Sequence, residues 1–328
     1  MTDKKEYSET SVPVVIVGAG PVGLALAAEL GRMRIQCLLI DKRDGVLDVP
    51  KMSQVSARAM EFCRRWGIAK TVRTAVWPEG RALDFVYLRS LLGRELVRLK
   101  IPPHAERDRL SFTPEGPCHC PQIYFDPILA AHVKSLPSVA VRYRMALESF
   151  EPDGDLVRVR IKDAASDKAE AVTARFMVGC DGAASAVREA LGIQLGGAGI
   201  VAGSLNIFFH APELKSLHDK GWARFYRIID ESGCWSELIP IDGNELWRLT
   251  VFDTARSGGS PDEYLRRMMG GTFPYRIISA QVWERRDYVA DSYNRGNVFL
   301  AGDSAHQCSP TGGLGMHTGM EEAVNLAW

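Results

Sequence analysis

Two short apolar runs near the N-terminus predict strands that are buried on both faces of a parallel sheet. They cover residues 12–17 (VPVVIV) and 36–40 (QCLLI), and both are rich in Val, Ile and Leu. Between them, the sequence suits a helix with small residues where it meets the sheet, and the residues that indicate it are Leu24, Leu26, Ala27, Ala28 and Leu30. Strand, helix and strand in this order predict the first part of a nucleotide-binding α/β fold.

The apolar pattern also predicts further helices, and strands that differ from the first two. Residues 51–73 have apolar side chains near a 3.6-residue period and predict a helix, and residues 120–143 predict a helix followed by a strand. Residues 156–163 (LVRVRIKD) alternate strictly, which is typical of an antiparallel strand with one face in solvent. Short strand-like pieces also occur between 76 and 113.

The middle of the chain predicts a mostly antiparallel lobe. Alternating runs separated by Gly, Asp and Asn turns cover 204–211, 223–230, 234–241 and 246–252. A further buried strand follows within GNVFLAGDSAH, residues 296–306. The expected fold class is therefore α/β, a Rossmann-like dinucleotide-binding domain with an inserted β lobe. We expect the binding domain to comprise 1–75, 114–190 and 286–328, and the lobe to comprise 76–113 and 191–285.

The turn after the first strand carries a G-x-G-x-x-G motif. Gly18 permits a tight turn, Gly20 lets the backbone approach a pyrophosphate, and Gly23 lets the helix lie close to the strand. Asp41 ends the second strand, where an acid can accept hydrogen bonds from ribose hydroxyls. An acid at this position argues against a 2′-phosphate and favours FAD or NAD over NADP in this pocket.

Composition excludes several classes of protein. The 328 residues include 40 basic and 40 acidic side chains, without the basic stripe of a nucleic-acid-binding protein. No apolar run approaches the twenty residues of a membrane span, and the polar N-terminus does not resemble a secretory signal. The seven cysteines are odd in number and scattered, which favours reduced thiols in the cytoplasm.

A crowded stretch near the end of the chain raises two other kinds of site. Residues 302–319 (GDSAHQCSPTGGLGMHTG) place Asp303, Ser304 and His306 together, but no G-x-S-x-G elbow surrounds the serine, so a hydrolase site is not expected. A metal site at Cys118 and Cys120 is not expected either, because no second cluster has ligand spacing.

Three ordered motifs together carry a resemblance to a known family. The N-terminal fingerprint, CDGAASAVR at 180–188 and the stretch at 302–319 follow one another as in the single-component flavoprotein monooxygenases. The chain most resembles the phenol and polyketide aromatic hydroxylases of that group, from residue 12 to 328. The resemblance implies that the binding domain holds FAD and that the inserted lobe holds the substrate.

The resemblance also implies which residues contact FAD. Arg58 matches a position near the phosphate and ribose, Gln122 one at the ribityl chain, and Asp303 one that binds the ribityl hydroxyls. The Asp-Gly motif, with Asp181 and Arg188, is associated with FAD and with NAD(P)H use. The full set of implied cofactor contacts is Gly18, Gly20, Pro21, Gly23, Asp41, Lys42, Arg58, Gln122, Asp181, Gly182, Arg188, Gly302, Asp303, Pro310, Gly313, Leu314, Gly315, Met316 and His317.

The chemistry implied by the resemblance is aromatic hydroxylation. NADH or NADPH, bound transiently, reduces the flavin, and O2 then gives a C4a-hydroperoxide that hydroxylates a phenolic or polyketide-like ring. No residue is identified as catalytic; His210, Arg224 and Tyr226 are polar groups in strand-like runs of the lobe that are more often structural. The oligomeric state is not indicated.

The chain departs from the family pattern at a few positions. His317 stands where members usually have Asn, Glu322 where they have Asp, and Ser304 where Ala is common. We expect no consequence of Ser304, and we expect His306 and Cys308 to be packing residues. The helix that contains Glu321 continues in related proteins, so this sequence is expected to be a fragment or a truncated relative.

Two other functions remain open at this point. A flavin-dependent halogenase carries W-x-W-x-I-P, and residues 235–240 (WSELIP) match it except for the second Trp. A non-catalytic FAD-binding relative would keep the fold without consuming NAD(P)H.

Overall fold

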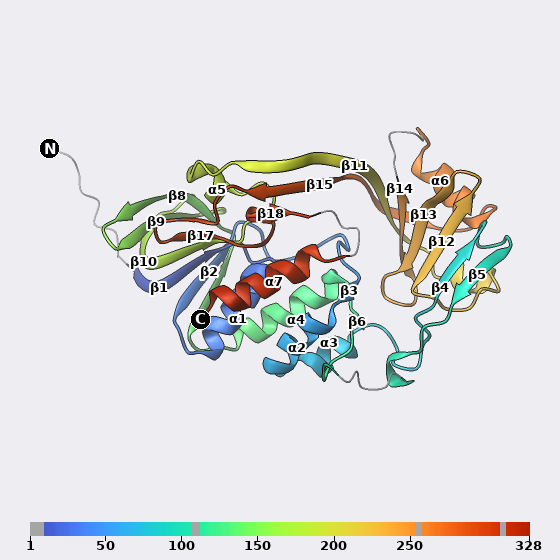
Figure 1. The fold of residues 1–328 in the computed structure, drawn as a ribbon, viewed down its shortest axis with the longest axis horizontal. Coiled ribbons are helices and arrows are strands. Elements are labelled where there is room, and N and C mark those ends of the chain that lie inside the picture. Colours follow the sequence, from blue (N-terminus) through green and yellow to red (C-terminus); the bar gives the residue numbers. More distant parts are fainter. Residues whose placement is uncertain (1–9, 107–111, 253–257, 309–312) are drawn as a thin grey trace. The chain divides into compact units, whose positions relative to one another are not determined.

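The computed structural model describes residues 10–106, 112–252, 258–308 and 313–328. Contacts divide the chain into two compact units, whose elements are labelled in Figure 1. The first unit comprises Met1–Leu47, Asp126–Gly199 and Asp287–Trp328, and the second comprises Asp48–Phe125 and Ile200–Arg286. The expected roles of these parts as FAD-binding domain and substrate lobe stay predictions.

A parallel sheet forms the centre of the first unit, as the apolar runs predict. Its order is β16-β17-β10-β1-β2-β7, and the five strands from β17 to β7 are parallel to their neighbours. The chain passes from β1 to β2 on one side and later to β10 on the other, so β1 lies where the strand order reverses. The strands are β1 (Thr10–Val17), β2 (Cys37–Asp41), β7 (Val139–Tyr143), β10 (Ala169–Gly179), β16 (Asn294–Arg295) and β17 (Val298–Leu300).

An antiparallel extension adjoins this sheet. Strands β8 (Met145–Asp153) and β9 (Leu156–Asp163) pair with each other, and β9 pairs with β10. The alternation predicted for β9 is confirmed, because Val157, Val159 and Ile161 are buried and the residues between them are exposed. These three side chains join the core that β1, β2 and β10 form.

Two helices lie side by side on this unit. They are α1 (Pro21–Arg32) and α7 (Gly315–Leu326), which pack against each other (Figure 1). Helix α4 (Gln122–Lys134) precedes β7, as predicted, and the short α5 (Ala186–Ala190) follows β10. Strand β18 (His306–Gln307) pairs antiparallel with the end of β15 (Arg276–Ala290).

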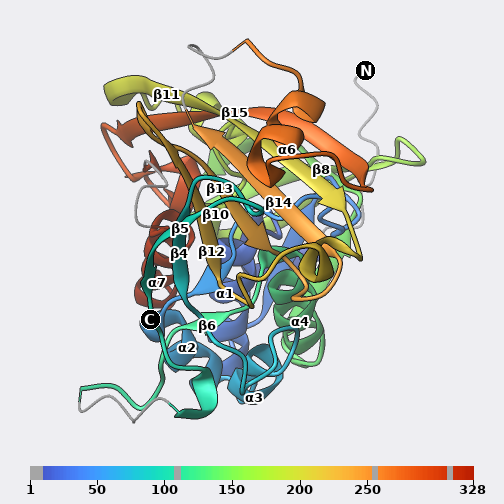
Figure 2. The ribbon, with the colours of Figure 1, turned by 90° about the vertical axis from the view of Figure 1, so that its right-hand side faces the viewer.

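The second unit is built on an antiparallel sheet, as the alternating runs predict. Strands follow one another in the order β11-β14-β13-β12-β4-β5, and only β12 and β4 are parallel (Figure 2). Their bounds are β4 (Phe85–Leu88), β5 (Glu95–Leu99), β11 (Leu195–His210), β12 (Phe225–Asp230), β13 (Gly233–Pro240) and β14 (Leu246–Phe252). Together with the parallel sheet of the first unit, this confirms the predicted α/β class with an antiparallel lobe.

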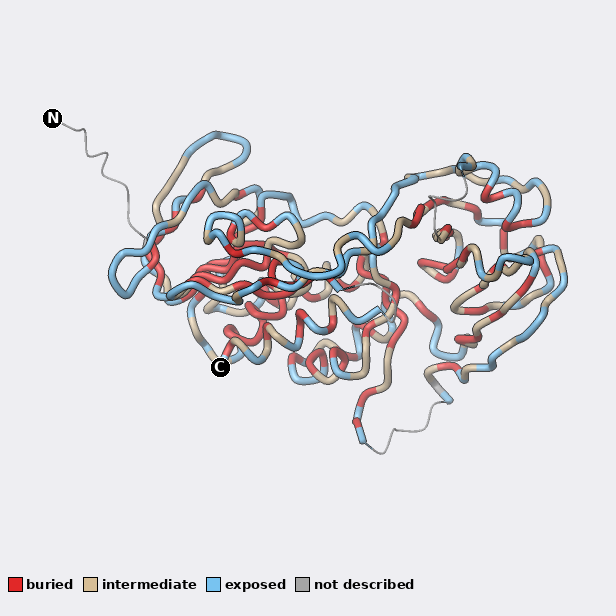
Figure 3. The backbone as a smooth tube through the Cα atoms, turned by 45° about the horizontal axis from the view of Figure 1, so that its top comes forward, coloured by how far each residue is buried: buried red, intermediate tan, exposed pale blue. Residues whose placement is uncertain are grey.

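The core of the second unit lies on one face of that sheet. Trp247 and Tyr226 are fully buried there, and helix α6 (Pro261–Met269) adds Leu265 and Met268. Figure 3 shows buried backbone positions within each of the two units. Helix α6 was not predicted, although the sequence contains its capping box, in which the Ser260 side chain accepts from the Glu263 N–H and the Glu263 side chain accepts from the Ser260 N–H.

The predicted helix at 51–73 is wrong in its extent. Residues Gln54–Val55 form a short strand, β3, which pairs with β6 (Cys118–His119). Ser56 then caps α2 (Ala57–Arg65), and a turn with Gly67 at φ +78° separates α2 from α3 (Ala69–Arg73). Across the described residues, none of the helices is long and apolar enough to cross a membrane.

The close approach of α1 to the turn before it gives a first prediction. A Cβ at Gly23 would lie 1.9 Å from the carbonyl oxygen of Gly18. We therefore expect Gly23→Ala to lower the free energy of unfolding by about 1–3 kcal/mol, because backbone must shift to admit the methyl group. Urea denaturation followed by circular dichroism measures the change.

Gly196 is the matched control, since a Cβ there meets nothing within 4 Å. Gly196→Ala should leave the stability within about 0.5 kcal/mol of the parent. Equal stabilities for the two variants would show that α1 does not depend on this contact.

Candidate functional site

Four turns carry most of the predicted cofactor contacts, and they meet at one edge of the parallel sheet. They follow the carboxyl ends of β2, β1, β10 and β17, which are neighbours in that order. Ligands of open α/β sheets bind at this edge, next to the strand where the order reverses. The structure thus brings together the fingerprint, Asp41, the Asp-Gly motif and the Gly-Asp motif.

Close backbone packing requires glycine at positions 18 and 23 of the fingerprint. Gly18 has φ +108°, and a Cβ there would lie 2.3 Å from the carbonyl oxygen of Cys180. Its N–H donates to the carbonyl oxygen of Ile40 at 2.8 Å, so the turn touches both neighbouring strands. Gly20 differs, because a Cβ added there meets no protein atom within 4 Å. Space beside Gly20 is therefore open to a ligand.

The N-terminus of α1 is suited to an anion. Gly20 is its N-cap and makes no side-chain capping bond, Pro21 occupies the first turn, and that turn contains no acidic residue. The first N–H groups of a helix have no partner within the helix, and the helix dipole favours negative charge beside them. This end of α1 has the properties of a phosphate site.

Asp41 is tied to the fingerprint turn. It is 6% exposed, and its Oδ2 accepts a hydrogen bond from the backbone N–H of Ala19 at 2.8 Å. Its Oδ1 accepts from the backbone N–H of Arg43 at 2.8 Å, and the Arg43 guanidinium lies 3.3 Å from the same oxygen. Lys42 between them is exposed. The acid is thereby held at the end of β2 beside the glycines.

The Asp-Gly motif forms a rigid corner after β10. Asp181 accepts hydrogen bonds from the Ser185 hydroxyl at 2.5 Å and from the Val187 N–H at 3.2 Å, and Gly182 has φ +83°. The guanidinium of Arg188 donates to the carbonyl oxygens of Ala183 at 3.0 Å and of Ser304 at 2.9 Å. Arg188 therefore joins the Asp-Gly corner to the Gly-Asp turn.

Buried hydrogen bonds of Ser304 anchor the Gly-Asp turn, which corrects the expectation that this serine has no consequence. Ser304 is fully buried; its hydroxyl donates to the Gly179 carbonyl at 2.7 Å and accepts from the Ala301 N–H at 3.1 Å. The serine thus has a consequence that alanine would lack, because it links the ends of β17 and β10. Gly302 has φ +65°, and the side chain of Asp303 is exposed.

Helix α7 begins at Gly315. Its N-cap, Leu314, makes no side-chain capping bond, and the first turn contains no acidic residue. Gly313 has φ +68°, and a Cβ at Gly315 meets nothing within 4 Å. Met316 is half-buried and His317 is buried. Pro310, another predicted contact, lies outside the described residues.

Two predicted contacts belong to the second unit. Arg58 is exposed at the start of α2, where it donates to Glu61 at 2.6 Å and lies over the ring of Phe62 at 4.9 Å. Gln122 begins α4, is buried, and donates its backbone N–H to the Met52 carbonyl at 2.9 Å. The contact of every residue in the predicted set with a cofactor stays a prediction.

A row of polar side chains on the second unit was not predicted from the sequence. Asn206, Thr250, Glu237, Arg227 and Tyr87 are paired in register across five strands. Thr250 donates to Asn206 at 2.7 Å, and Arg227 reaches Glu237 at 2.9 Å and the Tyr87 hydroxyl at 3.2 Å. Their period-2 alternation with buried residues was visible in the sequence, but the strand register was not.

The polar row lies beside aromatic rings. Phe85 and Phe225 are paired in register on β4 and β12, and their rings meet edge to face at 4.8 Å. The Arg227 guanidinium lies 5.8 Å from the centroid of each ring. This face of the sheet combines a cation, hydroxyls and aromatic surface, which suits a flat aromatic ligand with a polar substituent.

Other polar groups of the lobe have structural partners. Tyr226 is buried, donates to the Gly221 carbonyl at 2.6 Å and accepts from the Ala223 N–H at 3.0 Å. His210 lies 3.2 Å from Glu245, and Arg224 donates to Gln54. These bonds favour the structural interpretation of all three.

The structure also shows the surroundings of the halogenase-like run and of the cysteines considered for a metal site. Trp235 packs beside the ring of Tyr264 and under the guanidinium of Arg267, so this part of the halogenase-like run contributes to the packing of α6. Cys118 and Cys120 are both buried. Among the described residues, no group of three or more His, Cys, Asp or Glu side chains could hold a metal ion.

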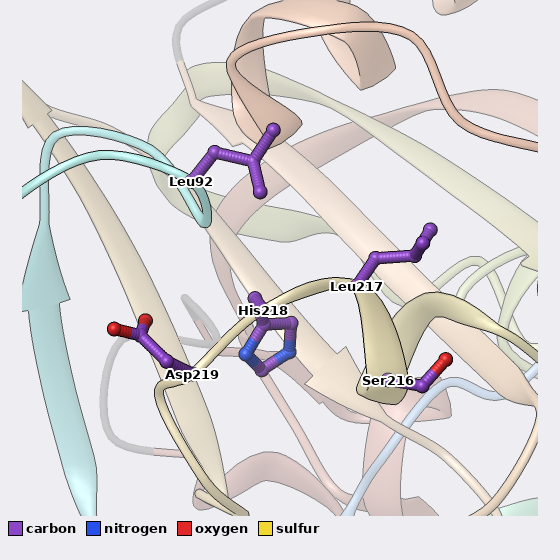
Figure 4. Close-up of a pocket in the computed structure, with 5 residues that line it drawn as sticks. All are labelled: Leu92, Ser216, Leu217, His218 and Asp219. Carbon is purple, nitrogen blue, oxygen red and sulfur yellow. The ribbon is translucent and has the colours of Figure 1, made fainter.

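A surface depression of about 510 Å³ also occurs in the second unit (Figure 4). Leu92, Leu217, His218 and neighbouring polar residues line it. Burial lowers the pKa of His218 to about 4, with Lys215 and Lys220 adding to the effect, so the imidazole is neutral near pH 7. The depression contains none of the predicted site residues.

Comparisons with known proteins identify the family of the chain. The FAD binding domain family matches residues 11–328. A putative polyketide hydroxylase of Streptomyces halstedii is 32% identical in an alignment of length 330 that covers 97% of this chain and 58% of the relative.

Solved structures give the same result. The rebeccamycin biosynthetic enzyme RebC with reduced flavin matches with a TM-score of 0.91 and 37% identity, over 98% of this chain and 61% of that one. A ternary complex of aklavinone-11 hydroxylase with FAD and aklavinone matches with a TM-score of 0.85 and 26% identity, over 100% and 62%. The chain thus spans about three fifths of the length of these relatives. The chain belongs to the FAD binding domain family.

Proposed function

We propose that this chain binds FAD and is the cofactor- and substrate-binding part of a monooxygenase that hydroxylates a phenolic or polyketide-like aromatic compound. The observation that carries the proposal is the meeting of the four cofactor turns at one edge of the parallel sheet. Family membership supports FAD as the dinucleotide, and the acid at Asp41 agrees with a ribose that has no 2′-phosphate.

The residues at this edge fit FAD. The open space at Gly20 and the first turn of α1 would accept the pyrophosphate, since bulkier side chains or an acidic first turn would oppose it. Asp41 would hold the adenosine ribose. Asp303, whose side chain is exposed, would hold the ribityl hydroxyls.

Helix α7 would serve the flavin ring. Its N-terminal N–H groups carry partial positive charge, which stabilises negative charge that gathers on a ring when it is reduced. Gly313 and Gly315 leave room for the ring to approach the backbone. When bound, FAD would supply the redox chemistry, and the residues of this chain would bind it, orient it and exclude water.

The reaction would consume NADH or NADPH, a proton and O2, and would give NAD(P)⁺, water and the hydroxylated ring. The polar row on the second unit is the proposed contact surface for the substrate. Arg227 would attract a phenolate oxygen or a carboxylate, and the rings of Phe85 and Phe225 would contact the flat surface of the substrate. Seven free cysteines support a reducing, cytoplasmic setting.

Asp303 gives a direct prediction about the cofactor. We expect the purified protein to be yellow or to take up added FAD, and Asp303→Asn to raise the Kd for FAD roughly 10- to 100-fold, because a charged acceptor is lost. Titration of the protein with FAD, followed by flavin fluorescence, measures both values.

Asp155→Asn is the control, since Asp155 is an exposed acid in the turn between β8 and β9. It should bind FAD with the parent's Kd. A parent protein that neither carries nor binds FAD would contradict the proposed function.

Arg227 gives a prediction about the substrate. We expect a panel of phenols and aromatic acids to contain compounds that stimulate NAD(P)H oxidation in the presence of O2. For the best of them, Arg227→Gln should raise KM about tenfold and leave the Kd for FAD unchanged, because a charge-assisted hydrogen bond is lost from the substrate alone.

Arg267→Gln is the matched variant, as Arg267 also forms an ion pair and covers an aromatic ring in the same unit. It should keep the parent's KM. A protein that holds FAD but consumes no NAD(P)H with any aromatic compound would support the non-catalytic relative instead.

A further inference from the structure

The carboxylate of Glu322 bridges both ends of the Gly-Asp turn. Its Oε2 accepts the backbone N–H of Gly302 at 2.9 Å, and its Oε1 lies 2.7 Å from Nε2 of His306. Gly302 directly precedes Asp303, and His306 follows it by three residues. Glu322 of α7 therefore contacts the turn on both sides of Asp303, the proposed contact of the ribityl chain. His306 was expected to be a packing residue, and this ion pair corrects that expectation.

The pair is held in place by its surroundings. The side chain of His306 is 5% exposed and that of Glu322 is 26% exposed. The ring of Tyr293 stacks over His306 at 6.4 Å, and Nδ1 of His306 lies 3.5 Å from Sγ of Cys308. The backbone of His306 pairs in register with Val289 of β15. These contacts enclose the imidazole beside the Glu322 carboxylate.

The same contact connects two parts of the proposed flavin site. Gly302 lies against α1, where its Cβ would be 2.8 Å from the side chain of Val22, and Gly319 of α7 packs on the same side chain. Glu322 fixes the turn to α7, whose first residues are the proposed contacts of the flavin ring. A change in the carboxylate would therefore move Asp303 relative to the start of α7.

We propose that Glu322 and His306 are positioning residues for FAD, and that their ion pair holds Asp303 in the orientation that binds the cofactor. The proposal rests on the proposed binding of FAD at Asp303. It assigns Glu322 and His306 an effect on affinity through the turn, without contact with the flavin. Because one partner is a histidine, the affinity for FAD depends on pH in the neutral range.

The charges around the pair set the direction of that dependence. The hydrogen bond to Glu322 raises the pKa of His306 above its ordinary value of 6.5, and the charges of Glu322 and Asp303 add to this, against the effect of burial. The ion pair therefore stabilises the Gly-Asp turn fully below about pH 6.5, and this stabilisation is lost as the pH rises through the raised pKa of His306. The other titratable groups near the pair are Cys180, Asp287, Tyr293 and Cys308.

FAD titrations between about pH 5.5 and 8.5 test the proposal. For the parent we expect the Kd to rise about tenfold across this range, since the attraction between the imidazolium and the carboxylate is lost when the imidazole becomes neutral. Glu322→Gln should bind FAD about tenfold more weakly at the acid end and show no pH dependence. Glu322→Asp, which keeps the carboxylate, should retain the pH dependence.

The chain offers a matched control in Glu245, which pairs with His210 in the second unit at 3.2 Å. Glu245→Gln removes the same kind of pair and should leave the FAD titrations unchanged. Circular dichroism without FAD shows whether each variant is folded. If Glu322→Gln does not fold, the parent's own profile decides, because a flat profile overturns the proposal.

Two failures are distinguishable. A parent that binds FAD at every pH with a constant Kd, or a folded Glu322→Gln that matches Glu245→Gln, overturns the role of the ion pair alone. A parent that binds no FAD at any pH overturns the proposed function and this inference with it.

Discussion

The contact between α1 and the turn at Gly18 is the constraint on which the cofactor edge depends. Gly18 lies against the carbonyl of Cys180, and Gly23 lies against the carbonyl of Gly18, so three backbone segments meet without an intervening side chain. This close packing places the N-terminus of α1 directly above the ends of β1 and β10. The other turns have their places because those two strands bring β2 and β17 in as neighbours.

Side chains then fix the turns to one another. Ser304 joins the ends of β17 and β10, Arg188 joins the Asp-Gly corner to the Gly-Asp turn, and Glu322 joins that turn to α7. Each bond goes to a backbone carbonyl or N–H, so it fixes the course of the chain rather than a single side chain. A site assembled from four separate stretches of sequence needs such links, because each turn alone is short and has few contacts of its own.

The sequence predicted the βαβ start, the β9 alternation and the antiparallel strands, because each depends on a local period of apolar residues. It missed α6, whose capping box at Ser260 was present but unused, and it overextended the helix at 51–73, where β3 forms only by pairing with the distant β6. The motifs predicted Asp41 at the end of β2 and Asp303 after β17, where both lie, while their contact with a cofactor stays a prediction. The polar row at Arg227 and the pair of His306 with Glu322 could not be predicted, because both depend on the register or packing of segments far apart in the sequence.

A crystal structure of the chain grown with FAD tests the central claim most directly, namely that the carboxyl edge of the parallel sheet holds the cofactor. The account predicts the pyrophosphate within hydrogen-bond distance of the N–H groups at Gly20–Val22, the adenosine ribose on Asp41 and the ribityl chain on Asp303. Electron density for FAD elsewhere on the protein, with these three contacts absent, would contradict it.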